Sequence, residues 1–194
     1  MAGGSPGAAG HRNRPPMGAS PLACVLEDLA ASGVQLALLV CAAWSLGPPV
    51  RFGDLIVPQF TLGPDGTSVH YGNASGRAEA QPHVAQALAA AALREKDRVH
   101  VGGNGTCEAL YRITPQLARD LRRQGCLSMD NGEAATMFCV APAVGMMGGV
   151  VFQPYIDLTR GWDPARLGAA YAAAAARQAD AALAACCHLV DHGR

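Results

Sequence analysis

The sequence predicts an α/β protein, and three observations along the chain support this class. Residues 21–31 repeat apolar side chains at helical spacing, and Ser32-Gly33 then ends that helix. Residues 34–46 follow as a run that is apolar except at Gln35 and Ser45, which is typical of a strand buried on both faces. Residues 99–103 indicate another strand, which runs into glycines. A helix, a tight glycine turn and a buried strand in this order are the pattern of an α/β fold.

The remaining expected elements continue this alternation. Strands or extended pieces are expected at 55–58, 68–71 and 150–152, and helices at 82–93, 115–124, 164–190 and in a segment that ends near 143. Residues 104–111 are expected to form a loop beyond the strand at 99–103. Ligand sites collect outside the carboxyl ends of strands in open α/β sheets, so this loop is a candidate wall of a site.

Length and charge narrow the possible classes. The 194 residues have the length of one domain, which we divide into a disordered Gly/Pro-rich arm at 1–19 and a folded domain at 20–194. The formal net charge is zero, so composition gives no electrostatic reason to expect nucleic acid or an acidic membrane as a partner. No apolar segment is long enough to span a bilayer.

The cysteines indicate a reducing compartment. Seven is an odd number, and several of them lie within apolar runs, as reduced cysteines do in a cytoplasmic protein. Cys186-Cys187-His188 lacks the spacing of a zinc site, and we expect no metal.

Acidic and amide side chains gather over residues 128–138, where the chain enters an apolar helix. An acid in the first helical turn benefits from the dipole and the free N–H groups there, and a buried charge needs a partner. Two interpretations remain open from the residues alone. Either Asn131 or Asp130 caps the helix and Glu133 is an ordinary first-turn acid, or the Glu133 carboxylate binds a ligand.

Four short motifs occur in a fixed order along the chain. They are Leu26-Glu27-Asp28-Leu29 with Gly33-Val34; Phe52-Gly53-Asp54-Leu55-Ile56-Val57 with Asp65-Gly66-Thr67-Ser68-Val69-His70-Tyr71; Thr106-Cys107-Glu108-Ala109-Leu110-Tyr111; and Asn131-Gly132-Glu133-Ala134-Ala135-Thr136. In this order they resemble the nucleoside phosphorylase superfamily, of the uridine phosphorylase and hexameric purine nucleoside phosphorylase type. The resemblance implies a three-layer α/β/α fold with a mixed central β-sheet that lacks the first strands of the family.

The last two motifs are similar to the family's base-pocket loop and ribose motif. The substrate-binding residues that this implies are Glu133, Asn131, Gly132, Thr106, Glu108, Leu110 and Tyr111. Glu133 is expected to hold the ribose hydroxyls, because a carboxylate only accepts hydrogen bonds and sugar hydroxyls donate them. A carboxylate there also stabilises the positive charge that develops on the ribose. Leu110 takes the place of the ring that stacks on the base, and Tyr111 is the nearest ring.

The chain departs from the family most clearly at the phosphate site. Leu39, Ala43 and Trp44 stand where the family has an arginine, a threonine and a glycine. A dianion needs charge-assisted donors, and this strand has none. The position of the family's proton-donating Asp falls at residues 151–153, and the early arginine and the histidine that reaches a neighbouring subunit have no counterpart. We therefore assign no catalytic and no phosphate-binding residue.

The resemblance implies pentosyl transfer from a (deoxy)ribonucleoside to phosphate, with phosphate as co-substrate and no cofactor. One alternative is a phosphate-independent nucleosidase, for which Glu108 is the only unassigned acid in the pocket-loop motif. The other is a catalytically impaired or truncated nucleoside-binding homologue that acts as an oligomer partner, because a sheet without its first strands exposes unpaired edges. The expected partners are a nucleoside or nucleobase, purine or pyrimidine, and further copies of the chain in a homo-oligomer.

Overall fold

The structure, a computed structural model, describes residues 17–94, 98–161 and 168–192. The described strands are β1 (Leu36–Ser45), β2 (Leu55–Leu62), β3 (Arg77–Glu79), β4 (Val99–Thr106), β5 (Cys126–Asp130) and β6 (Met147–Asp157). The helices are α1 (Ala19–Ala31), α2 (Pro82–Arg94), α3 (Pro115–Arg123), α4 (Glu133–Ala143) and α5 (Ala169–His192), with short 3₁₀ turns η1 (Ser68–Tyr71) and η2 (Leu110–Arg112).

The described strands form one mixed sheet in the order β3-β2-β4-β5-β1-β6. Strand β4 is parallel to β2 and β5, and β1 is parallel to β6, whereas β1–β5 and β2–β3 are antiparallel. The sheet also curls on itself, because β6 meets β2 where Phe152 lies opposite Ile56. Both of these side chains are fully buried at the centre of the main core.

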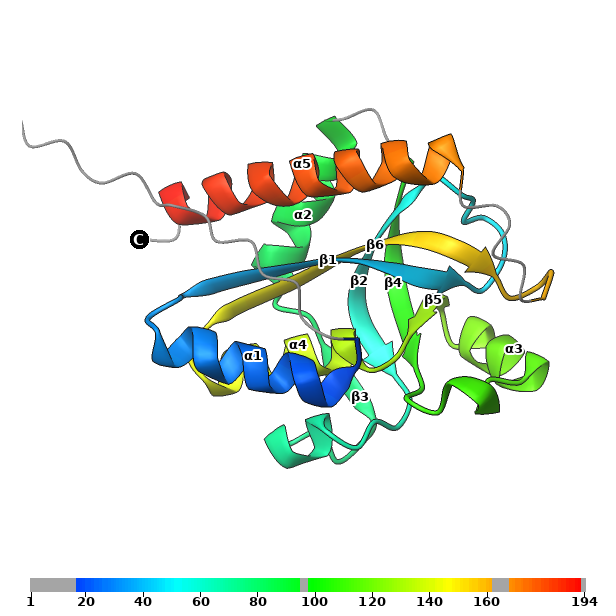
Figure 1. Ribbon diagram of the computed structural model, residues 1–194, viewed down its shortest axis with the longest axis horizontal. Helices are drawn as coiled ribbons and strands as arrows, with labels where there is room; N and C mark the ends of the chain where they lie inside the picture. The colour runs from blue at the N-terminus through cyan, green and yellow to red at the C-terminus, as the bar shows by residue number, and fades with distance from the viewer. Residues whose placement is uncertain (1–16, 95–97, 162–167, 193–194) are drawn as a thin grey trace, which may run out of the picture.

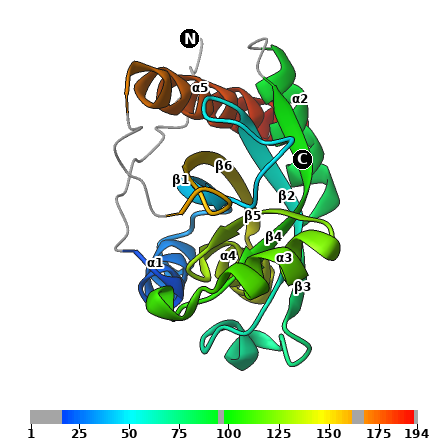
Figure 2. The ribbon, with the colours of Figure 1, turned by 90° about the vertical axis from the view of Figure 1, so that its right-hand side faces the viewer.

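Helices cover the sheet on both sides (Figure 1). Helices α2 and α5 pack against each other and on β6, while α1 and α4 pack together on the opposite side. Figure 2 shows the same layers end-on, with β1 and β6 between α5 and α1. This arrangement confirms the three-layer α/β/α fold with a mixed sheet. A smaller second core lies where α3 packs on β5, around Trp44, Leu121 and Met129.

Strand β4 is longer than predicted and takes in the start of the expected loop, since it runs to Thr106. Its glycines pair with β2 and β5 as strand residues, and neighbouring side chains occupy the space that a Cβ would need there. A Cβ on Gly103 would lie 2.4 Å from the Phe60 ring, and one on Gly105 would lie 2.5 Å from Leu121. Glycine at these positions therefore allows close packing instead of ending the strand.

Several other expectations needed correction. The extended piece expected at 68–71 is the 3₁₀ turn η1, because the Asp65 carboxylate accepts hydrogen bonds from the backbone N–H groups of Thr67 and Ser68 and curls the chain. The short strands β3 and β5 were not predicted. The disordered arm expected at 1–19 was too long by at least one residue, since Ala19 is a buried residue of α1. Residues 1–16 of that arm and residues 164–167 of the last expected helix lie outside the described residues.

Strand β1 confirms the strand expected at 34–46 but not its burial on both faces. Strand β5 pairs with β1 only at Trp44 and Ser45. Along Leu36–Ala43, β1 therefore has β6 on one side and, among the described residues, no strand on the other. The Val40 side chain is 40 % exposed.

None of the described helices has the length and apolar character required to cross a membrane.

Candidate functional site

The junction between β5 and α4 is a sharp turn that glycine makes possible. Gly132 has a φ of 97°, in the left-handed region, and lies directly before Glu133, the first residue of α4. A Cβ on Gly132 would also lie 2.8 Å from the Cβ of Ala19 in α1. This close approach of α1 and the turn brings the chain around Gly18 next to the first turn of α4.

The Glu133 carboxylate is buried and is held in place by backbone N–H groups. Its Oε1 accepts a hydrogen bond from the N–H of Gly18 at 2.9 Å, and its Oε2 accepts one from the N–H of Asn131, also at 2.9 Å. Only 6 % of the residue is exposed. A carboxylate has about four lone-pair positions, so these two bonds fix its orientation and leave capacity for hydroxyl donors from a ligand.

Asp130, the last residue of β5, caps α4 with its side chain. Its Oδ2 accepts from the N–H of Ala134 at 2.7 Å, and its Oδ1 accepts from Nδ2 of Asn104 at 3.0 Å. Burial, and next the negative charge of Glu133, raise the pKa of the Asp130 carboxyl to about 7. Of the two side chains proposed as caps, Asp130 is the one that accepts an N–H of the first turn of α4, while the N-cap residue itself is Gly132.

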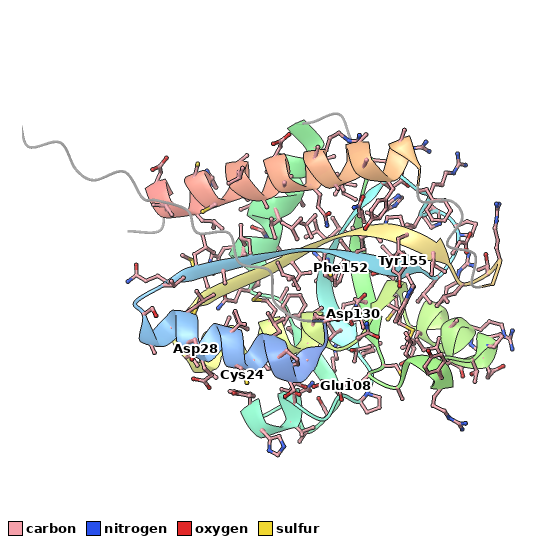
Figure 3. The ribbon with its side chains drawn as sticks, viewed as in Figure 1. Cys24, Asp28, Glu108, Asp130, Phe152 and Tyr155 are labelled. Carbon is pink, nitrogen blue, oxygen red and sulfur yellow. The ribbon has the colours of Figure 1, made fainter. Side chains whose placement is uncertain are left out.

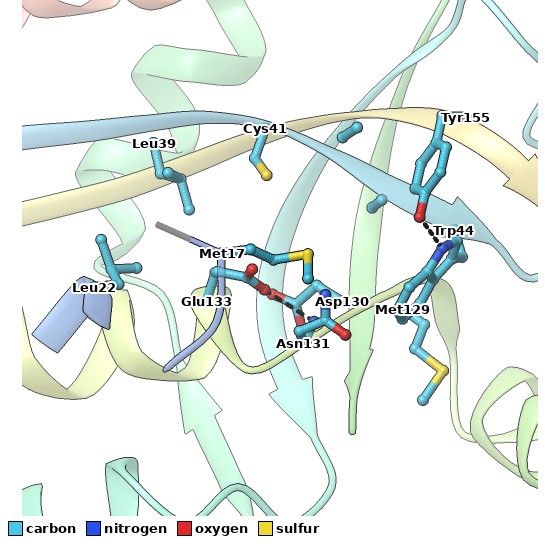
Figure 4. Close-up of a pocket in the computed structure, with 12 residues that line it drawn as sticks. Met17, Leu22, Leu39, Cys41, Trp44, Met129, Asp130, Asn131, Glu133 and Tyr155 are labelled. Atoms are coloured by element: carbon cyan, nitrogen blue, oxygen red, sulfur yellow. Dashed lines mark hydrogen bonds between the residues drawn. The ribbon is translucent and has the colours of Figure 1, made fainter. Parts of the chain in front are cut away.

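A cavity of about 290 Å³ lies between β1, the start of α1 and the β5–α4 junction. It is lined by Met17, Leu22, Leu39, Cys41, Ala42, Ala43, Trp44, Met129, Asp130, Asn131, Glu133 and Tyr155. Figure 4 shows Glu133 and Asn131 together on one side of this cavity and Tyr155 with Trp44 on the other. The polar groups thus lie at two separate places on a mostly apolar wall.

An aromatic pair forms the second polar place. The indole Nε1–H of Trp44 donates to the hydroxyl oxygen of Tyr155 at 2.5 Å, and the two rings are tilted with centroids 6.3 Å apart. Trp44 is buried, whereas Tyr155 is partly exposed. Cys41 lies on the β1 wall, and burial, with Glu133 and Asp130 adding to it, raises the pKa of its thiol to about 12.

The positions that resemble the family's phosphate strand face the cavity as an apolar surface. Leu39, Ala43 and Trp44 all line it, and the described lining contains no lysine, arginine or histidine. A phosphate dianion placed against this wall has no cationic partner there. The departure seen in the sequence is thus also a feature of the cavity.

The predicted base-pocket residues lie at the end of β4 and on the segment after it, beside the β5–α4 junction but outside the cavity lining: Thr106 pairs with Asp130, and a Cβ on Gly132 would lie 3.4 Å from the Cγ of Glu108. Thr106 is buried and its Oγ1 has no hydrogen-bond partner in the structure, Glu108 accepts the N–H of Gly66 at 2.6 Å, and Leu110 packs against the second core. Tyr111 is 97 % exposed. None of the four lines the cavity, and in Figure 3 Glu108 lies away from Tyr155. Their roles, like those of Glu133, Asn131 and the buried Gly132, stay predictions.

Sequence reasoning missed the roles of two polar side chains in the cavity: Asp130 is a buried, hydrogen-bonded carboxyl, and Tyr155 is a polar group of the lining. Asp130 was recognised only as a possible cap, because its contact with Asn104 joins positions far apart in the chain. Tyr155 lies in a stretch of β6 that was not predicted as strand. In the described ranges, no three or more His, Cys, Asp or Glu side chains are grouped so that they could hold a metal ion.

A mixed, curled sheet between two helical layers, with a buried acid on the helix after a strand, is the architecture of a nucleoside phosphorylase fold. The chain belongs to the phosphorylase superfamily, whose family model matches residues 3–190. It is similar to the uridine phosphorylase of Thermococcus kodakarensis, with 29 % identity over 147 residues that cover 70 % of this chain and 53 % of that protein. The chain therefore spans about half the length of this curated relative.

A solved structure supports the same fold. The crystal structure of uridine phosphorylase from Vibrio fischeri ES114 superposes with a TM-score of 0.79, covering 89 % of this chain and 72 % of that one. The sequence identity is 18 %, so this likeness concerns the fold.

Proposed function

We propose that the protein acts on the N-glycosidic bond of a nucleoside and transfers the pentose to phosphate. The observation that carries this proposal is the Glu133 carboxylate, which is shielded from bulk solvent, is oriented by two backbone N–H groups and lines a cavity. Membership of the phosphorylase superfamily and the uridine phosphorylase relatives support it. The ligand is a nucleoside or nucleobase, phosphate is the co-substrate, and no cofactor takes part.

In this reaction the bond between C1′ and the base nitrogen breaks, a phosphate oxygen bonds to C1′, and the base leaves after gaining a proton. Positive charge develops on the ribose as the base departs. Glu133 accepts hydrogen bonds from the ribose hydroxyls and stabilises that charge from a fixed position. The side-chain amide of Asn131, beside it on the lining, adds a neutral donor and acceptor.

A second candidate function is nucleoside binding without turnover, and the apolar wall of Leu39, Ala43 and Trp44 favours it. In this case the chain acts as a partner in an oligomer. The strand edge of β1 along Leu36–Ala43, which has no described partner strand, supports the proposal that the chain forms a homo-oligomer. The described cysteines are free thiols, which supports a cytoplasmic location.

Release of free base separates the candidate functions. The purified protein is incubated with uridine, inosine and adenosine, with and without phosphate, and base is measured by chromatography. We expect base only when phosphate is present. Base release without phosphate would indicate hydrolysis. Binding of a nucleoside without any base release would leave the second candidate.

The role of Glu133 is tested by Glu133→Ala, with Glu79→Gln as the matched control. Glu79 is an exposed acid that pairs with Arg77 and lies away from the cavity lining. We expect Glu133→Ala to remove nucleoside binding or turnover and Glu79→Gln to leave both unchanged. Circular dichroism and thermal unfolding of both variants show whether α1 and α4 stay folded. If folded Glu133→Ala binds and turns over nucleosides like the wild type, Glu133 does not hold the sugar.

A further inference from the structure

Tyr155 presents a hydroxyl proton that no described residue of the protein accepts. The indole N–H of Trp44 only donates hydrogen bonds, so in the pair at 2.5 Å the oxygen of Tyr155 is the acceptor. The phenol proton must therefore point elsewhere. Among the described residues, no acceptor receives a hydrogen bond from it.

The hydroxyl stays protonated and neutral at physiological pH. Burial, as the largest cause, raises the pKa of Tyr155. The negative charge of Glu133 in the same cavity acts in the same direction. Tyr155 thus supplies a neutral O–H donor at the side of the cavity away from Asn131 and Glu133 (Figure 4).

The cavity therefore has a hydrogen-bond acceptor on one side and a hydrogen-bond donor on the other. Glu133 accepts at one place, Tyr155 donates at the other, and apolar side chains of β1 such as Leu39 and Ala43 form part of the wall. An anion is a poor match for the Tyr155 side, because a single neutral donor replaces the cations that a phosphate needs. A neutral acceptor such as a carbonyl oxygen fits this donor.

We propose that Tyr155, held by Trp44, binds a carbonyl oxygen of the base and makes the cavity select oxo-nucleosides such as uridine and inosine over their amino counterparts. The inference rests on the proposed function, since it takes the sugar of the same nucleoside to lie at Glu133. An exocyclic amino group at that place is a donor, so it cannot accept a hydrogen bond from the Tyr155 O–H. The Tyr155 oxygen, in turn, already accepts the indole N–H of Trp44.

Binding of matched nucleoside pairs tests this selection. Dissociation constants are measured by isothermal titration for uridine against cytidine and for inosine against adenosine, in the absence of phosphate. In the wild type we expect the oxo member of each pair to bind more tightly. In Tyr155→Phe we expect its affinity to fall about 3- to 10-fold, as for loss of one neutral hydrogen bond, while the amino member changes little.

Two further variants keep the test independent of folding. Tyr155→Phe leaves the buried indole of Trp44 without this acceptor, so Trp44→Phe/Tyr155→Phe, which removes both members of the pair, is expected to show the same loss of selection without that unpaired donor. Tyr71→Phe is the matched control, because the Tyr71 hydroxyl donates to Glu27 outside the cavity. We expect it to bind all four nucleosides like the wild type.

The outcomes separate this inference from the proposed function. Loss of binding in Glu133→Ala together with loss of oxo-selection in both Tyr155 variants supports both. Loss of binding in Glu133→Ala with unchanged selection in folded Tyr155→Phe overturns the role of Tyr155 and leaves the proposed function standing. A phosphate-dependent gain of affinity that disappears in Tyr155→Phe would also overturn it, because the hydroxyl would then hold the anion. If the wild type binds no nucleoside, the proposed function fails and this inference fails with it.

Discussion

Asp130 shows how one buried side chain links helix capping to acid–base behaviour. It accepts hydrogen bonds from Ala134 and Asn104, which favour its charged form, yet it lies fully buried beside Glu133. Burial and the neighbouring charge outweigh the hydrogen bonds, and the pKa rises from 3.8 to about 7. The carboxyl therefore changes its charge state close to neutral pH.

This shift predicts a pH-dependent stability. Between pH values of about 4 and 7 the folded chain keeps a proton on Asp130 that the unfolded chain has released. The contribution of Asp130 to the free energy of unfolding is thus greatest at low pH and falls as the pH rises toward the folded pKa, after which it is constant. We expect Asp130→Asn, which stays neutral, to lose this decline. Thermal unfolding at pH 5 and pH 8 measures it; an equal change of Tm in wild type and variant would contradict the prediction.

The cysteines differ in expected reactivity. The raised pKa of Cys41, about 12, leaves almost no thiolate at pH 8, whereas Cys24 and Cys187 are exposed. Because the thiolate is the nucleophile, we expect iodoacetamide to alkylate Cys24 and Cys187 at least about tenfold faster than Cys41. Peptide mass spectrometry over a time course measures the three rates. Alkylation of Cys41 as fast as Cys24 would show that the cavity wall is open to solvent.

Residue-level chemistry was predictable only where neighbours in the chain carry it. Glu133 was predicted to bind a ligand because Asn131-Gly132-Glu133, at the start of α4, resembles the ribose motif of the family, and all of these residues are neighbours in the chain. The partner of its Oε1, the N–H of Gly18, lies 115 positions away and left no signal. The same holds for Tyr155, whose donor Trp44 is 111 positions away.

At the level of elements, the entry into α4 depends on Gly132. Alanine there must adopt a φ of 97° and place its Cβ 2.8 Å from Ala19. We expect Gly132→Ala to lower the free energy of unfolding by about 1–3 kcal/mol and to weaken nucleoside binding, because Glu133 moves with the turn. Urea unfolding and titration measure the two effects.

Gly145 provides the matched control for this variant. Its φ of 75° is also left-handed, but no atom lies within 4 Å of a Cβ built on it. We expect Gly145→Ala to cost only the backbone strain, about 1 kcal/mol, and to leave binding unchanged. Equal costs for the two variants would mean that the contact with Ala19 has no influence.

The sequence predicted elements well where one face is apolar and poorly where neighbours decide. Helices α1, α2 and α3 and the strand β1 were found from their apolar periodicity or run. The end of β4 was missed because its glycines read as a loop, while in the fold they make room for Phe60 and Leu121. Strand β3 has three residues, too few for any periodic pattern, and is defined only by its pairing with β2.

For the whole molecule, the β1 edge gives an expectation about association. Along Leu36–Ala43 the backbone faces no described strand on the side opposite β6, and Val40 is exposed. A charged residue on such an edge opposes strand pairing with another chain. We expect Val40→Lys to shift the protein toward the monomer in light scattering coupled to gel filtration. Val69→Lys, at an exposed position in η1, is the control; equal masses for wild type and Val40→Lys would exclude this edge as the contact.

The hydrogen bond from Gly18 to Glu133 has a consequence for spectroscopy. Because this amide donates to the carboxylate proposed to hold the sugar, its proton resonance reports on the electron density of that carboxylate. We expect the amide cross-peak of Gly18 to move on nucleoside titration and the movement to be absent in Glu133→Ala. Gly145, whose amide donates to the Pro142 carbonyl, serves as a silent reference in the same spectrum. The residue before the first helix thus carries an internal probe of occupancy in a cavity formed mainly by distant parts of the chain.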